Sequence, residues 1–343
     1  MQPRTDLALL LENLVELSLT PYFDKAIESH INVLVNVIRH ALSASPRYDD
    51  AIIAELSDHV WAIHRYLQGS STRESPYEIA YCMRVAAEDW HANPCLMMTA
   101  LLDVKDFHLL PLTSWKFIEA AISNFDGDIP GEQLVFLGVP RVYRHMPLFC
   151  APLYHELGHF VEITCNVVET VWLQSGETEH KNLRCNHFKE YFADIFAASY
   201  IGSTTVHFLN AISPDASDSH THPSTEKRIE VIRKFIEGEP CEQVDAIQNA
   251  LDVLGFPKLS VHFTSPDISS AFNDLRPYKI GSREELHGIM VSGWSYLTQA
   301  LHGSGPSWTK NADPLEIVRV VNDLVGKSIR NASVTSLWQG RPL

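Results

Sequence analysis

The sequence predicts a mainly α-helical protein of the α+β class, with a small sheet between helical N- and C-terminal regions. Two observations lead to this fold class. Apolar residues recur at steps of three and four through most of the chain, which is typical of amphipathic helices. One segment, 133–143, is instead rich in Val, Phe, Leu and Tyr and follows a cluster of turn residues, so we expect a strand there.

Each expected element follows from local spacing and from the residues that end it. Pro21 divides the first helical pattern, 5–43, in two. Pro140 within the expected strand suits a sheet edge, to which an extended peptide adds as a further strand. The other expected helices are 49–67, 76–90, 114–123, 147–161, 189–200, 225–236, 244–254, 283–301 and 314–329. We expect three regions: helical 1–125, catalytic 126–240 and helical 241–343.

Composition excludes several classes of function. The 343 residues are 45% hydrophobic and 20% charged, which is enough apolar material for a packed core. The net charge of −15 and the absence of a Lys/Arg run argue against binding to nucleic acid or to an anionic membrane. We expect no membrane span, because no apolar stretch reaches about 18 residues. Six scattered cysteines and no secretory signal predict reduced thiols in a cytoplasmic protein.

The segment HELGH (155–159) carries the first candidate chemistry. On a helix, His155 and His159 share one face, one turn apart, where both imidazoles can reach a single metal ion. Glu156 lies beside them, where its carboxylate can take a proton from metal-bound water. The pattern is short enough to occur by chance, so further ligands are needed to support a metal site.

A pair of carboxylates follows at Glu190 and Asp194. They share a face of a helix whose flanking residues are apolar, and buried carboxylates need a cation. One carboxylate would bind the metal, and the other would hold a ligand imidazole through its free N–H. The alternative is a solvated pair, although like charges at this spacing destabilise a helix slightly.

The third candidate segment is HPSTEKR (222–228). Pro223 with Ser224 or Thr225 indicates the start of a helix, and Arg228 lies about one turn into it. His222 and Arg228 would stabilise a tetrahedral intermediate or brace the acidic residues at the metal. The plainer alternative is a capped helix with surface charge.

Together the three motifs resemble the gluzincin-type zinc metallopeptidases that include the CAAX prenyl endoproteases and the heat-shock membrane proteases. The resemblance covers roughly residues 130–236. It implies a zincin-like core with Zn²⁺ on His155, His159 and Glu190, Glu156 as general base, and Asp194 behind a ligand. His222 and Arg228 would then form part of the active-site wall. Many relatives are embedded in membranes, whereas this sequence predicts no span, so membrane-bound or prenylated substrates do not carry over.

The expected function is a zinc-dependent endopeptidase that cleaves a peptide or protein substrate through metal-activated water. Two alternatives stay open at this stage. The site hydrolyses another amide, or it is catalytically silent and the chain is an interaction protein. The helical regions suggest either a regulatory partner or self-restraint of the site by those helices.

Overall fold

The computed structural model describes residues 3–22, 24–43, 48–71, 76–90, 95–111, 122, 125, 133–176 and 179–340. The chain divides into two compact units. The first comprises Met1–Ala80 and His91–Arg144, and the second comprises Tyr81–Trp90 and His145–Leu343. Among the described residues, helices predominate and the strands form one three-stranded sheet, which confirms the mainly helical class with a small sheet.

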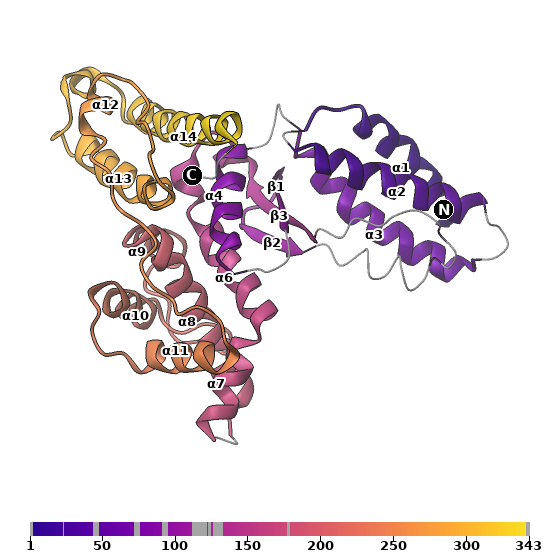
Figure 1. Ribbon diagram of the computed structural model, residues 1–343, viewed down its shortest axis with the longest axis horizontal. Helices are drawn as coiled ribbons and strands as arrows, with labels where there is room; N and C mark the ends of the chain where they lie inside the picture. The colour runs from indigo at the N-terminus through magenta and orange to yellow at the C-terminus, as the bar shows by residue number, and fades with distance from the viewer. Residues whose placement is uncertain are drawn as a thin grey trace. The chain divides into compact units, whose positions relative to one another are not determined.

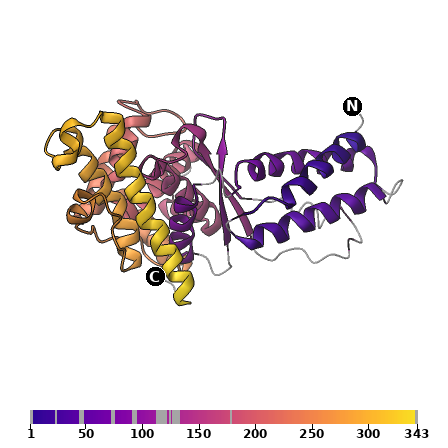
Figure 2. The same ribbon diagram turned by 90° about the horizontal axis from the view of Figure 1, so that it is seen from above.

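In the first unit, α3 packs on β1, and α1 contacts both α2 and α3 (Figures 1 and 2). Alternate residues of β1, from Leu96 to Leu102, join the buried faces of these helices in one apolar core. This spacing is the period of two expected of a strand that presents one face to a helical layer. The elements are α1 (Pro3–Ser18), α2 (Lys25–Ser43), α3 (Asp50–Gln68), β1 (Cys95–Leu102), β2 (His108–Pro111) and β3 (Gln133–Pro140).

The sheet corrects two expectations. Its order is β1-β3-β2, with β3 parallel to β1 and antiparallel to β2, so the expected strand is central and its edges are both paired. The expectation, based on Pro140, that a substrate peptide adds to this strand as an edge strand is therefore wrong. Sequence periodicity also missed β1 and β2, and the expected strand ends at Pro140, where a 3-10 turn (Arg141–Tyr143) begins.

Helices are the regular elements of the second unit, and its described part contains no strand. Its centre is α8, whose residues from Glu190 to Ile201 are all buried and which contacts α6, α7, α9, α10, α11 and α13. The helices are α4 (Tyr77–Glu88, from Tyr81 onward), α6 (Pro152–Cys165), α7 (Val167–Ser175), α8 (Lys181–Ile201), α9 (Thr204–Ile212), α10 (Thr225–Glu237), α11 (Glu242–Leu254), α12 (Ser269–Asn273), α13 (Arg283–Leu301) and α14 (Pro314–Gln339).

The expected helices of this unit are all present, with shifted ends. The helix expected at 189–200 begins eight residues earlier as α8, and a 3-10 turn (Pro147–Cys150) precedes α6. The helix expected at 114–123 lies, except for residue 122, outside the described residues. Of the helices that the structure describes, none combines the length and the apolar character needed to span a bilayer.

Candidate metal centre

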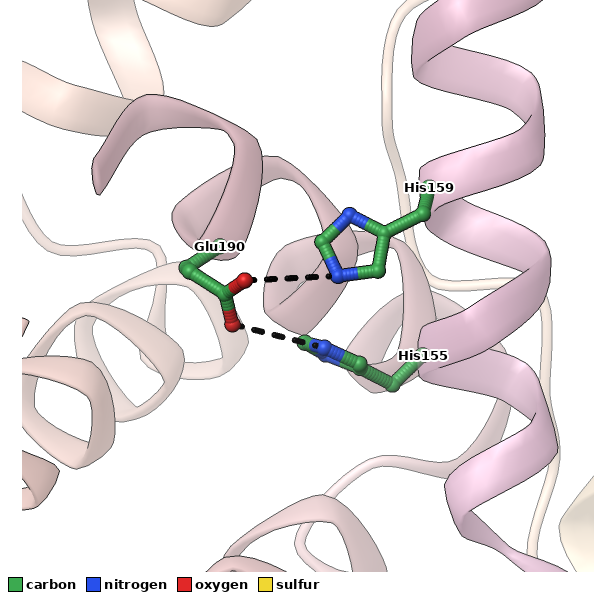
Figure 3. A group of neighbouring side chains, drawn as sticks. All are labelled: His155, His159 and Glu190. Carbon is green, nitrogen blue, oxygen red and sulfur yellow. Dashed lines mark ion pairs between the residues drawn. The ribbon is translucent and has the colours of Figure 1, made fainter. Parts of the chain in front are cut away.

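The three predicted ligands come together between α6 and α8. Figure 3 shows His155 and His159 projecting from one helix toward Glu190 on the other. Gly158 lets these helices approach, because a Cβ at this position would lie 2.7 Å from the Cα of Ala193. The small residues within the HELGH and EYFAD motifs therefore position the ligands as a packed pair of helices.

The distances suit a shared metal ion better than direct hydrogen bonds. His155 Nε2 lies 3.5 Å from Glu190 Oε2, and His159 Nε2 lies 3.4 Å from Glu190 Oε1. Good N–H···O bonds span about 2.7–3.2 Å. Ligand atoms about 2.1 Å from a tetrahedral zinc ion are separated by about 3.4 Å.

The three ligand atoms all lie within 4.8 Å of one another. Glu190 Oε2 is buried without a hydrogen-bond partner among the described residues, although the Arg228 guanidinium lies 3.3 Å away, so this oxygen can still accept a metal ion. The donor set of two imidazoles and one carboxylate is the set that catalytic zinc takes, so the residues fit the ion.

Asp194 and Arg228 hold this cluster from behind. The fully buried Asp194 accepts a hydrogen bond from His155 Nδ1 at 2.9 Å and two bonds from the Arg228 guanidinium at 2.7 Å each. His155 thus donates from Nδ1 and turns Nε2 toward Glu190. Arg228 also lies 3.3 Å from Glu190 Oε2. It is 7% exposed, so it is a brace for the acidic residues and not a surface charge.

Burial and close charges shift the pKa values of these groups in different directions. Burial opposes the charged form of His155, but the hydrogen bond to Asp194 and the nearby Glu190 carboxylate outweigh burial and raise the pKa of His155 to about 9. Burial and the adjacent charge of His155 lower the pKa of His159 to about 4. Burial opposes ionisation of Asp194, yet the Arg228 charge lowers its pKa to about 2. The pKa of Glu190 is also lowered, against its burial, by the nearby His155 imidazole. Both carboxylates are therefore ionised at neutral pH.

The other two candidate residues lie around the cluster. Glu156 is partly exposed on α6, next to the first histidine. His222 precedes α10, its side chain is 55% exposed, and its Nε2 lies 3.5 Å from Glu190 Oε1. Ser224 caps α10, as the sequence predicts, by accepting a bond from the Lys227 N–H. The structure thus brings all three motifs to one site.

Sequence reasoning missed the residues that fix the loop before α10. Asp218 accepts the Ser224 N–H at 2.7 Å and forms an ion pair with Lys227. The His222 N–H donates to Ser219 Oγ at 2.9 Å, and Ser219 N–H donates back to the His222 carbonyl. This loop restrains His222 beside Glu190. An Asp six residues ahead of a helix cap has no local signature, so only the folded loop reveals its role.

The comparisons with known proteins find no match: no protein family, no curated protein and no solved structure is similar to this chain. The resemblance to gluzincins therefore depends on the three motifs and on the cluster that their residues form.

Proposed function

We propose that this protein is a zinc-dependent endopeptidase in which Glu156 acts as the general base. The observation that carries the proposal is the buried cluster of His155, His159 and Glu190, whose ligand atoms lie within 4.8 Å of one another. Two imidazoles and a carboxylate leave one position of a tetrahedral zinc ion for water, which is the arrangement of a catalytic site.

The residues divide the chemistry among them. Bound zinc supplies a Lewis acid that acidifies water and polarises the substrate carbonyl. Glu156 takes the proton of the attacking water and returns it to the leaving amine. His222, the exposed group beside Glu190, is placed to donate a hydrogen bond to charge that develops on the substrate oxygen. Asp194 and Arg228 act as positioning residues, because their contacts orient His155 and balance the buried carboxylates.

Zinc content is the first test of the site. Protein purified without added metal or chelator should contain close to one zinc per chain, and Glu190→Ala should lose most of it because one of three ligands is gone. The matched control is Glu12→Ala, which removes an exposed carboxylate from α1. A folded wild type that takes up no zinc, even when zinc is supplied, contradicts the proposal.

Hydrolysis of fluorescein-labelled casein tests the reaction. Glu156→Gln should keep its zinc and lose hydrolysis by at least a hundredfold, because the amide cannot accept the proton of water. Hydrolysis that survives in Glu156→Gln shows that another group is the base. Zinc without hydrolysis of casein or of a broad peptide mixture favours the silent interaction protein instead.

A further inference from the structure

A polar cleft of about 450 Å³ follows the two helices that carry the proposed ligands. Glu162, one turn beyond His159 on α6, lines one side. Lys189, the residue before Glu190 on α8, lines the other. His220, from the loop that holds His222, also borders the cleft. The cleft therefore lies beside the candidate metal centre and shares its supporting elements.

Glu162 is the feature of this cleft that points to a ligand. Glu162 is 3% exposed, and its Oε1 accepts the Val168 N–H at 3.1 Å, which caps the start of α7. The second oxygen, Oε2, is buried and has no hydrogen-bond partner among the described residues. A buried carboxylate oxygen without a donor is costly, and a ligand N–H in the cleft would satisfy it.

The remaining charges of the cleft indicate the kind of donor. Lys181 is neutralised by Glu169 at 2.7 Å. Lys189 forms no ion pair with any described residue, and its charge acts on Glu162, where it lowers the carboxyl pKa against the larger effect of burial. A cationic side chain would meet Lys189 as a like charge, whereas a neutral peptide N–H would not. The N–H is thus the better partner for Oε2.

The side-chain amides that line the cleft and the length of the cleft also suit a polypeptide. Three asparagines (Asn166, Asn182 and Asn186) line the cleft, and each side-chain amide can both donate and accept, as a peptide unit does. The α8 lining runs from Lys181 to Lys189, ending next to Glu190. At 1.5 Å per residue this is about 12 Å, which an extended chain of about four residues spans.

We propose that this cleft is the subsite that receives the main chain of a polypeptide substrate, over about four residues on one side of the scissile bond, and that Glu162 Oε2 accepts one of its peptide N–H groups. The inference rests on the proposed function. It adds a substrate class, an extended polypeptide read through its backbone, and a residue that determines affinity for it.

The test measures peptide binding in a protein that does not cleave. Zinc-loaded full-length Glu156→Gln is titrated into fluorescein-labelled peptides of Ala and Ser, four to ten residues long, and anisotropy is recorded. Affinity should rise with length and level off after about four added residues. Glu162→Gln, added to this background, should weaken binding about tenfold. Glutamine can keep the bond to Val168 only by placing its NH₂ where Oε2 lies, which turns the acceptor into a donor.

Controls separate this inference from the proposed function and from misfolding. Glu12→Gln in the same background changes an exposed carboxylate and should leave binding unchanged. A second control uses peptides that each carry a single N-methyl group at a different position. At one position, N-methylation should weaken peptide binding to the Glu156→Gln protein about tenfold. The same N-methyl group should not weaken binding further when Glu162→Gln is also present. This readout alters the ligand, so it does not depend on the stability of a variant.

Two results would overturn the inference. Equal binding of all peptides by the Glu162 and Glu12 variants would remove Glu162 from the subsite. A lysine-containing peptide that gains affinity only while Glu162 is intact would show that the carboxylate takes a cation and not a main-chain N–H. Zinc content and casein hydrolysis of the wild type are measured separately. Either result would therefore overturn the subsite inference without contradicting the proposed zinc-dependent hydrolysis.

Discussion

Zinc binding should release one proton at pH 6, and this proton should come from His155. In the metal-free protein the pKa of His155 is raised to about 9 by its hydrogen bond to Asp194 and by the nearby Glu190 carboxylate, which together outweigh burial. His159, with a pKa lowered to about 4 by burial and by His155, is already neutral, and Asp194 and Glu190 are already ionised. A metal needs the neutral imidazole, so it must displace one proton from this cluster.

The effect of His155 protonation on zinc affinity depends on how far the pH lies below the pKa of His155. At pH 6, three pH units below the pKa, about one His155 in 1,000 is neutral, which weakens zinc binding by about 4 kcal/mol relative to its limit at high pH. Between pH 5.5 and 6.5 the affinity should therefore rise about tenfold per pH unit. Water bound to zinc ionises near pH 7, so in this lower pH range it should add little to the number of protons released on zinc binding.

Calorimetry at pH 6 in two buffers of different ionisation enthalpy measures the number of protons released. Competition with a chromogenic chelator measures the slope of affinity against pH. Asp194→Asn removes the charge that holds the proton on His155, so the slope should flatten. The same variant should bind zinc about 10–100-fold more weakly at high pH, because the imidazole is less well oriented. Affinity in the wild type that does not change across the window, or release of no proton, would refute the reasoning.

Three further outcomes test the surroundings of the centre. Arg228→Met leaves two buried carboxylates without their cation. Urea unfolding of the metal-free variant should therefore show a free energy of unfolding that is lower by about 3–5 kcal/mol, and added zinc should restore part of it. An unchanged unfolding midpoint contradicts this. Gly158→Ala places a Cβ 2.7 Å from the Ala193 Cα, and we expect about 1–3 kcal/mol of destabilisation with reduced zinc content; normal stability would show that the helices separate freely. Burial lowers the pKa of His287 to about 3. Below pH 6.5 this imidazole therefore stays neutral in the folded protein, whereas it becomes protonated in the unfolded chain. Between pH 6.5 and 5 this costs about 2 kcal/mol, and His287→Asn should remove that pH dependence of unfolding; an equal slope in both proteins would show that other groups cause it.

Local spacing predicted the helices of the candidate site because their period is strong. The helix expected at 225–236 corresponds to α10 at Thr225–Glu237, and its cap at Ser224 is as the sequence suggests. The start of α8 was less visible, because Lys181 to Phe188 are polar or mixed and only the residues from Glu190 onward are continuously buried. Element type is thus encoded locally, while helix ends depend on what packs against them.

The strands show where local reasoning stops. β1 reads CLMMTALL, a short apolar run without polar alternation, which a buried strand and a buried helix segment share. The central place of β3 depends on pairing with β1, whose partner residues lie about 38 positions away in sequence, as in Cys95 with Gln133. Pro140 is tolerated there because it ends the strand.

Burial of charge was the part of the site that the sequence could not decide. The motif allowed Arg228 to be a surface residue, an oxyanion donor or a brace, and these alternatives differ only in tertiary contacts. Its two bonds to Asp194 commit the guanidinium to the interior of the cluster. An arginine so held is poorly placed to approach a substrate, which leaves His222 as the exposed candidate for that role.

The charges of the centre predict that a proton and a metal ion would compete for it. Glu190 and Asp194 carry two negative charges, and the Arg228 guanidinium supplies one positive charge against them. The remaining negative charge is buried, so the metal-free cluster reaches neutrality by keeping a proton on His155. Bound zinc would replace that proton with two positive charges and leave the cluster with a net charge of about +1. That excess charge would favour ionisation of water at the open position, which is the property a hydrolase requires. A second arginine at the centre would raise the charge further and weaken zinc binding, whereas loss of Arg228 would tighten the hold on the cation but return the cluster to neutrality. In the proposed zinc enzyme, Arg228 would therefore set a balance between holding zinc and activating the water beside it.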